Sequence, residues 1–203
     1  MLELGGTFVL LGKHELNDPV QAGKLPIYFN PGYIEDYVFR PERNDLLDIL
    51  AERGIAGKSV VDVGTGAGFI AIACARLGAS PVYAVENDDY PFQHAEANFA
   101  LNQVDVKLIR RFEDAGQVFD LVINNMNVLS SYLALLPSMA KAMKHDGSMF
   151  LEVDEQALHR QAITEQGIPH GMHLLEATML TSGVKVVKKI KVSSREFWEV
   201  KHA

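Results

Sequence analysis

Residues 60–69 read Val-Val-Asp-Val-Gly-Thr-Gly-Ala-Gly-Phe, and this stretch decides the fold. The apolar, β-branched start predicts a buried strand over 59–63, and the apolar residues that follow the loop predict a helix over 69–77. Between them, Gly64, Gly66 and Gly68 let the backbone approach a ligand closely, while the first N–H groups of the helix face that ligand. The stretch therefore predicts a cofactor loop between a strand and a helix.

The spacing of the glycines distinguishes between kinds of nucleotide site. Dinucleotide-binding enzymes use G-x-G-x-x-G, and Phe69 stands where the last of those glycines, counted from Gly64, is required. A phosphate-binding P-loop needs Gly-Lys-Ser or Gly-Lys-Thr, and the stretch has neither. The pattern present is G-x-G-x-G preceded by Asp62. A nicotinamide-dependent oxidoreductase is therefore the weakest of the functions that such a loop allows.

An acid, Glu86, follows the next apolar run, Val82-Tyr83-Ala84-Val85. A carboxylate at the end of the second strand can accept hydrogen bonds from both hydroxyl groups of a ribose, as in dinucleotide-binding enzymes. The other interpretation of Glu86 is a solvated acid at the end of a strand. Its place after the glycine loop favours the ribose role, so the sequence predicts a nucleoside-containing cofactor.

The chain beyond residue 44 alternates apolar runs of strand length with helical patterns, which is typical of an α/β fold whose mostly parallel sheet has helices on both faces. Pro137 should start, break or kink its helix, and Asn102 should cap another. Residues 1–44 are irregular and rich in breakers, so we interpret them as an N-terminal extension or substrate flap on a domain over 45–203. The other predicted helices cover 45–52, 90–101, 129–144 and 154–166, and the other strands cover 82–85, 104–110, 120–123 and 148–153.

The C-terminal part has a different pattern. Residues 173–180, 184–192 and 196–202 alternate in polarity and are joined by short turns, which predicts antiparallel strands closing one edge of the sheet. The second of these runs is dense in lysine, and lysine on an exposed edge strand protects a sheet from unwanted pairing. Phe197 and Trp198 would point to opposite faces of the last strand, so one of the two can be exposed.

Composition narrows the class of protein. The chain has 203 residues, of which 48% are hydrophobic and 22% charged, with a net charge of −7 and one cysteine, Cys74. This charge disfavours nucleic acid as a partner, because phosphate contacts need a basic face. The sequence contains neither an apolar run of membrane-spanning length nor a secretory signal, and a single cysteine suits a reducing compartment. We therefore expect a cytoplasmic location.

The motifs VDVGTGAG, VYAVEND, AEANFALN and FDLVINN together resemble the core of the class I S-adenosylmethionine-dependent methyltransferases, over about residues 45–153. The resemblance implies a Rossmann-like fold with a seven-stranded sheet and an antiparallel C-terminal hairpin. It also implies that Glu86 holds the ribose of S-adenosylmethionine, that Asn87 lies near the adenine, and that Glu113 or Asp114 meets the adenine amino group. By the same resemblance, the residues that line the cofactor at the glycine loop are Asp62, Gly64, Thr65, Gly66, Gly68 and Phe69.

The fourth strand of the predicted sheet ends in Asn124-Asn125-Met126-Asn127, where a methyl acceptor would be expected. Methyltransferases of exocyclic amino groups and of glutamine amides usually carry Asn/Asp-Pro-Pro-Tyr/Phe at this place, which argues against those acceptors. Arginine methyltransferases have two glutamates after this strand, whereas 124–131 contain no acid. Asn124 and Asn125 are the candidate catalytic residues, able to hydrogen-bond the acceptor or the cofactor. The alternative is an ordinary turn, which Asn favours.

Within the class, the core is most similar to the ribosomal-protein lysine methyltransferase family. The shared features are the D-x-G-x-G-x-G loop, Ile70–Ala75, Leu77–Ala79 and Asn125–Asn127. That family has a separate N-terminal substrate-recognition domain, which residues 1–44 are too few to supply. Aromatic side chains of the extension could cover a sulfonium by cation–π contact or could simply bury the extension against the core: Tyr28, Phe29, Tyr33, Tyr37 and Phe39.

Two functions of different classes follow from these patterns. The first is an enzyme that transfers a methyl group from S-adenosylmethionine to a small molecule or a protein side chain. The second is an S-adenosylmethionine-binding module or partner subunit without activity of its own, since no catalytic base is evident. Cys74 lies among apolar residues of a helix and should be a buried structural thiol. His170 and His173 lack a third ligand nearby, so we expect no metal site.

Overall fold

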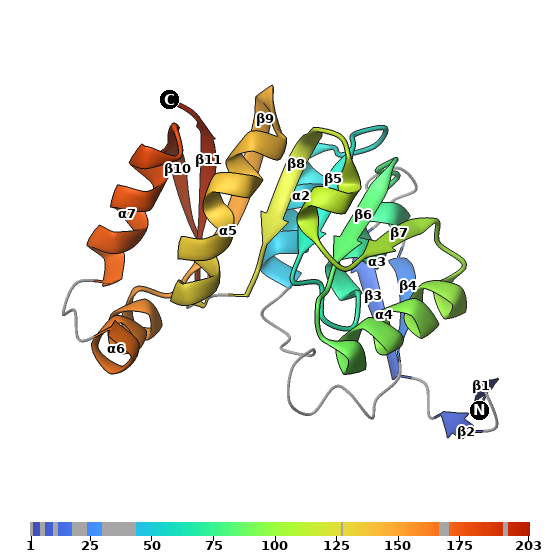
Figure 1. The fold of residues 1–203 in the computed structure, drawn as a ribbon. Coiled ribbons are helices and arrows are strands. Elements are labelled where there is room, and N and C mark those ends of the chain that lie inside the picture. Colours follow the sequence, from blue (N-terminus) through green and yellow to red (C-terminus); the bar gives the residue numbers. More distant parts are fainter. Residues whose placement is uncertain are drawn as a thin grey trace. The chain divides into compact units, whose positions relative to one another are not determined.

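The computed structural model describes residues 2–4, 7–9, 12–17, 24–29, 44–126, 128–166, 171–192 and 195–203. The main sheet has seven strands in the order β10-β11-β9-β8-β5-β6-β7 (Figure 1). Strands β5 to β9 pair in parallel where their registers are given, and the C-terminal strands β10 and β11 form an antiparallel hairpin. This confirms the predicted fold class. The chain divides into two compact units, Met1–Ala115 and Gly116–Ala203, and the boundary that the sequence suggests at residue 44 stays a prediction.

The first unit contains the predicted cofactor loop and the strands that support it. Strands β5 (Val60–Val63) and β6 (Val82–Val85) are buried along their whole length, as expected for continuous apolar runs in a parallel sheet. Strand β7 (Val106–Ile109) is only partly buried and lies at the end of the strand order. The other elements of this part are α2 (Asn44–Arg53), α3 (Phe69–Arg76), α4 (Asp89–Asn102) and the 3₁₀ helix η3 (Phe112–Ala115).

The N-terminal segment is more regular than the sequence suggests. Its described residues form two antiparallel strand pairs, β1 (Leu2–Leu4) with β2 (Thr7–Val9) and β3 (Gly12–Asn17) with β4 (Lys24–Phe29). The prediction of an irregular extension was therefore wrong for the described parts of residues 2–29, whereas the breakers Gly5-Gly6, Asn30-Pro31-Gly32 and Arg40-Pro41 lie outside the described residues. Strand β4 contacts α3 and α4. Tyr28 and Phe29 are described only as backbone positions of β4, whereas Tyr33, Tyr37, Phe39, Asn127 and His170 lie outside the described residues.

The second unit carries the C-terminal strands. Strand β8 (Phe119–Asn124) pairs in parallel with β9 (Met143–Val153), and β9 pairs antiparallel with β11 (Arg195–His202), which pairs with β10 (Val184–Val192). Phe197 and Trp198 on β11 are both fully buried, so both faces of this strand are covered and neither residue is exposed. The helices of this unit are α5 (Leu129–Ala142), α6 (Glu155–Gln166) and α7 (Gly171–Thr181).

Residues 171–181 form helix α7, so the strand predicted over 173–180 was wrong. The buried residues of α7 are Gly171, Leu175 and Met179, each four positions from the next, which is the helical spacing. A strand would have buried Ala177 as well, yet Ala177 is exposed. The hydroxyl of Thr178 donates to the carbonyl of Leu174 within the helix at 2.8 Å. Local polarity alternates here, but packing of one helical stripe decides the structure.

Three smaller expectations also differ from the structure. Pro137 lies inside α5, which runs from residue 129 to residue 142, so the proline neither starts nor ends the helix and costs it one N–H donor, while the kink stays a prediction. Asn102 is the last helical residue of α4, and its amide donates to the carbonyl of Asn98, so the left-handed C-cap position falls on Gln103. Strand β9 begins at Met143, five residues before the predicted start at 148, directly after α5.

The lysine-rich run lies on β10, at the end of the strand order, as predicted. Lys185, Lys188, Lys189 and Lys191 are exposed, and the pairing with β11 is interrupted by an irregularity between Val186 and Lys188. Charged side chains and a bulge are two devices that prevent another strand from adding to an edge. In the part of the chain that the structure describes, no helix has the length and apolarity to cross a membrane.

The helical register of α7 can be tested with one pair of substitutions. We expect Ala177→Glu to change the free energy of unfolding by less than about 0.5 kcal/mol, because its side chain enters solvent. Met179→Ala removes a buried side chain and should cost roughly 2–5 kcal/mol. Urea denaturation followed by circular dichroism measures both. A large loss for Ala177→Glu would mean that residues 175, 177 and 179 share a buried face, as in a strand.

Candidate functional site

The glycine loop joins the end of β5 to the start of α3 and is held against the end of β6. The backbone N–H groups of Gly64 and Thr65 both donate to the carbonyl of Val85, at 2.9 and 3.0 Å. All three glycines have positive φ angles, 71° at Gly64, 60° at Gly66 and 87° at Gly68. Residues with a Cβ rarely adopt this backbone region, so the path of the loop depends on glycine.

Gly66 and Gly68 face different surroundings. A Cβ added to Gly66 would meet no atom within 4 Å, so space above this residue is open. A Cβ on Gly68 would lie 2.4 Å from the ring of Phe99 on α4, far inside van der Waals contact. Gly68 is therefore needed for packing of the loop on α4, whereas Gly66 leaves room for a ligand.

Asp62 and Thr65, both predicted as cofactor-lining residues, contact each other. The Thr65 hydroxyl donates to a carboxylate oxygen of Asp62 at 2.6 Å, and both side chains are buried. This bond closes the first turn of the loop from within. Phe69, also predicted to line the cofactor, is the first residue of α3 and has a buried side chain.

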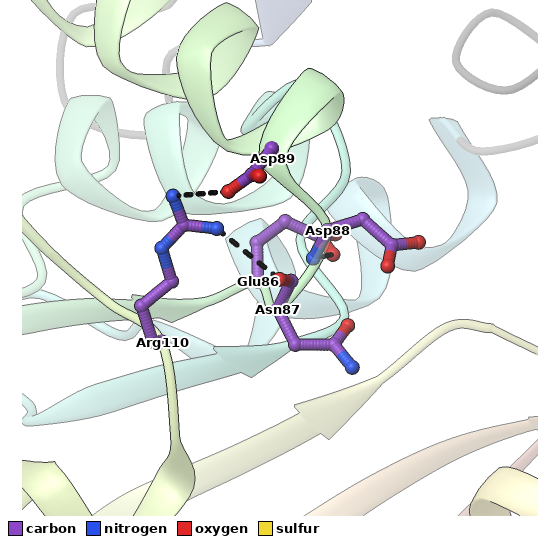
Figure 2. Close-up of polar contacts among 5 residues, drawn as sticks. All are labelled: Glu86, Asn87, Asp88, Asp89 and Arg110. Carbon is purple, nitrogen blue, oxygen red and sulfur yellow. Dashed lines mark hydrogen bonds and ion pairs between the residues drawn. The ribbon is translucent and has the colours of Figure 1, made fainter.

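Glu86, the acid that follows β6, is connected to the glycine loop by its own carboxylate. One oxygen, Oε2, accepts the N–H of Gly66 and the other, Oε1, accepts the N–H of Asp88, each at 3.0 Å. Only 8% of the residue is exposed. Figure 2 shows the bond within the loop after β6. The sequence predicted that Glu86 and the glycine loop act together, and the structure brings them into direct contact.

The two backbone bonds leave the Glu86 carboxylate with capacity for a ligand. An ionised carboxyl group offers about four lone-pair sites, and each oxygen of Glu86 uses one of them on a backbone N–H. The remaining sites can accept two hydroxyl protons, as a ribose diol requires. Because the backbone donors already fix the carboxylate, it does not have to be ordered when the ligand binds.

Two residues of α4 that the sequence did not single out hold the glycine loop. The amide of Asn98 donates to the carbonyl of Ala67 at 2.8 Å, and Phe99 packs against Gly68. The buried residues of α4 are Ala95, Asn98, Phe99 and Asn102, which form one helical stripe. A polar residue inside such a stripe needs a hydrogen-bond partner, and that is the signal in the sequence that could have found Asn98.

The residues predicted near the adenine have different environments. Asn87 is exposed, and its carbonyl accepts a hydrogen bond from the guanidinium of Arg110 at 3.1 Å (Figure 2). Glu113 and Asp114 lie on η3 after β7, and both are exposed. The Asp114 carboxylate pairs with Arg111 at 3.1 Å. The structure therefore brings Asn87, but not Asp114, into the hydrogen-bonded loop that follows Glu86; for Glu113 no such contact is described.

Asn124 is the last residue of β8 in the second unit, and Asn125 follows it. Their side chains differ in the hydrogen bonds that they make. The Asn124 side chain accepts the N–H of Met126 at 3.1 Å and donates to the sulfur of Met139 at 3.6 Å, so it stabilises the turn after the strand. Asn125 is also buried, but neither its amide nitrogen nor its oxygen has a hydrogen-bond partner among the described residues. A buried carboxamide without partners costs free energy, so this side chain has the capacity to bond a ligand.

Cys74 has no place in this chemistry. It is fully buried on α3, and burial together with the nearby Asp62 raises the pKa of its thiol above the ordinary value. A buried thiol with a raised pKa is a poor nucleophile. The interpretation of Cys74 as a structural residue is confirmed.

Comparison with known proteins gives a consistent result. A sequence profile of the family described as "Ribosomal protein L11 methyltransferase (PrmA)" matches residues 45–158. The ribosomal protein L11 methyltransferase of Symbiobacterium thermophilum is 32% identical over 147 residues, which is 71% of this chain and 48% of that protein. The protein of the same name from Lacticaseibacillus paracasei is 30% identical over 152 residues, 74% of this chain and 48% of the relative. The chain therefore spans about half the length of these curated relatives.

Two solved structures show the same fold. The ribosomal protein L11 methylase of Lactobacillus delbrueckii subsp. bulgaricus has a TM-score of 0.67 at 24% identity, over 86% of this chain and 83% of that one. The 16S rRNA N2 G1207 methyltransferase of T. thermophilus, in complex with AdoMet and guanosine, has a TM-score of 0.67 at 19% identity, over 96% of this chain and 51% of that one. At these identities, the likeness shows the Rossmann-like methyltransferase fold alone.

The contrast between Gly66 and Gly68 generates a prediction about stability. Gly66→Ala should cost about 1–2 kcal/mol of unfolding free energy, the strain of a left-handed alanine. Gly68→Ala adds a clash with Phe99 and should cost roughly 1–3 kcal/mol more. Chemical denaturation of both variants measures the difference. Equal losses would show that Phe99 does not restrict the loop.

Proposed function

Because the chain belongs to the ribosomal protein L11 methyltransferase family, we propose that it binds S-adenosylmethionine and transfers a methyl group to a protein side chain. The observation that supports this most is the contact between the Glu86 carboxylate and the N–H of Gly66 at 3.0 Å. It joins the acid predicted to hold a ribose to the glycine loop predicted to lie beneath it. The second unit, taken by itself, contains Asn125, whose side chain has unused hydrogen-bonding capacity among the described residues.

The residues of the first unit fit S-adenosylmethionine on two counts, and the second unit offers one further polar group. Open space above Gly66 gives room for a ligand next to the loop. The Glu86 carboxylate retains acceptor sites for two hydroxyl groups. The Asn125 amide can donate one hydrogen bond and accept another, from the cofactor or from the acceptor. We propose that the Gly66 loop and Glu86 hold the cofactor in the first unit; a ligand-binding role of Asn125 is a separate proposal for the second unit, where Asn124 supports the turn after β8.

Methyl transfer from a sulfonium requires no covalent intermediate with the protein. When bound, S-adenosylmethionine supplies a methyl group that is activated by a sulfonium. The chain's own residues must hold the cofactor, align the acceptor with it and keep water away. Glu86 orients the nucleoside end, because two backbone donors restrict its carboxylate. Asn125 lies beyond the carboxyl end of a parallel strand, which is where ligands of open α/β sheets bind.

The acceptor that we propose is a ribosomal protein of the kind named in the relatives, ribosomal protein L11. The sequence after β8 supports a protein amine over a guanidinium or a planar amide, since it lacks the paired acids and the Pro-Pro-aromatic motif of those enzymes. Incubation with labelled S-adenosylmethionine and purified bacterial L11, followed by mass spectrometry, tests this. Absence of label on L11 at saturating cofactor would contradict it.

The second function, a cofactor-binding module without activity, is supported by one observation. Residues 124–131 contain no side chain that could act as a base near neutral pH. Binding and turnover separate the two functions. An active enzyme forms S-adenosylhomocysteine with an acceptor present, whereas a binding module is stabilised by the cofactor and forms none.

Glu86 provides the sharpest test of the cofactor site. We expect Glu86→Gln to weaken S-adenosylmethionine binding by about ten-fold or more, because a charge-assisted hydrogen bond contributes roughly 1.5–3 kcal/mol. Isothermal titration measures the affinity. Glu96→Gln, the same chemical change at an exposed position of α4, is the matched control and should bind normally. Unchanged affinity in the Glu86 variant would remove the ribose assignment.

Asn125 allows stability and ligand binding to be separated. Asn125→Leu removes a buried amide that has no partner among the described residues, so unfolding free energy should stay the same or rise, by up to ~2 kcal/mol. Affinity for the cofactor or turnover of the acceptor should fall nonetheless.

Asn124→Leu is the matched control for Asn125. Its amide already bonds Met126 and Met139, so this variant should lose about 1–3 kcal/mol of stability. Thermal denaturation, titration and turnover assays together read out both effects. If Asn125→Leu is destabilised and keeps full binding and turnover, Asn125 is a structural residue.

A further inference from the structure

We propose that Arg110 is a positioning residue for the cofactor site, which holds the loop after β6 so that the Glu86 carboxylate keeps its place. This inference rests on the proposed role of Glu86. Arg110 follows directly after the last residue of β7, and nothing in the sequence motifs draws attention to it. Its side chain reaches across to the loop of residues 86–89 (Figure 2).

The guanidinium of Arg110 holds the residues on both sides of Asp88. Nη1 donates to the carbonyl of Asn87 at 3.1 Å, and Nη2 pairs with the carboxylate of Asp89 at 2.8 Å. Asp88 lies between them, and its N–H is one of the two donors that bind Glu86. Restricting Asn87 and Asp89 therefore restricts the amide that holds the acid.

The backbone leads into this arrangement. Parallel pairing between β6 and β7 ends at Val85 and Ile109, and the N–H of Glu86 then donates to the carbonyl of Ile109 at 3.1 Å. Beyond this point the segments that follow β6 and β7 separate, because helix α4 begins at Asp89. The Arg110 side chain connects the segment after β7 to the segment after β6, beyond the last backbone hydrogen bond between the two.

Planarity and not charge alone makes Arg110 suited to this role. Its guanidinium lies over the ring of Phe92, 3.8 Å from the ring centre, which fixes the plane of the fork. The ion pair with Asp89 contributes little by itself, because the two side chains are 41% and 85% exposed and water screens them. The bond to the Asn87 carbonyl and the contact with Phe92 therefore carry most of the restraint.

Amide hydrogen exchange in the unliganded protein tests this directly. In Arg110→Ala, the amides of Gly66 and Asp88 should exchange faster by about ten-fold, because the Glu86 carboxylate that accepts them is less ordered. Amides in the centre of β5 should keep their rates. Arg160→Ala, which removes the same charge from an exposed position of α6, is the matched control and should change neither group.

A double-mutant cycle then connects Arg110 with Glu86 in ligand binding. Arg110→Ala should weaken S-adenosylhomocysteine binding by about five-fold in the native background and by less than about two-fold when Glu86 is already glutamine. A residue that only supports the fold would weaken binding equally in both backgrounds. Arg110→Lys, which keeps the charge but lacks the planar fork, should give an intermediate loss, and Asp89→Asn a small one.

The outcomes separate this inference from the proposed function. Unchanged exchange at Gly66 and Asp88 in both Arg110 variants would overturn the positioning role, as would equal losses of affinity in the cycle. If exchange accelerates as expected and the unmodified protein fails to bind S-adenosylhomocysteine, Arg110 still orders Glu86 and it is the proposed cofactor that is wrong. Should Arg110→Ala not fold, Arg110→Lys carries the same measurements.

Discussion

A carboxylate that is nearly closed off from water needs hydrogen-bond donors from the protein, and Glu86 obtains them from two different loops. The N–H of Gly66 belongs to the loop after β5, and the N–H of Asp88 belongs to the loop after β6. Parallel register between these strands brings their carboxyl ends side by side, so one side chain can satisfy both loops. The open glycine, the left-handed backbone and the start of α4 are all arranged around this carboxylate.

Two of the buried asparagines show that the same side chain can either support the fold or remain able to bind a ligand. The Asn98 amide on α4 donates a hydrogen bond to the carbonyl of Ala67, and this bond holds the glycine loop against α4. Asn125 is also buried, but its side chain makes no hydrogen bond within the described residues. Folding alone gains nothing from such a group, because its desolvation is not compensated. A buried carboxamide without hydrogen-bond partners in the protein is suited to a site in which a ligand supplies those hydrogen bonds.

Prediction of structure from sequence succeeded where a pattern lies within a few consecutive residues. It failed where packing against residues distant in sequence determines the secondary structure. The glycine loop, the strand before it and the acid directly after the next strand are each marked by a local pattern, and each appears where expected. The segment 173–180 alternates in polarity like a strand, but a buried stripe at every fourth residue makes it part of helix α7. Pro137 carries a strong signal to break a helix, yet the packing of α5 tolerates one lost hydrogen bond. Such cases depend on contacts with residues that are distant in the sequence, which a short stretch of sequence does not reveal.

The sequence by itself determined the α/β class, the loop of left-handed glycines, the acid that follows β6 and the lysine edge of β10. These follow from periodicity and from backbone sterics, which act over a few residues. Only the tertiary structure decided what each polar group contacts. Thr65 bonds Asp62, Arg110 holds the loop around Asp88, and Asn124 is used where Asn125 is not. Hydrogen bonds form between groups that folding brings within about 3 Å, whatever their separation along the chain.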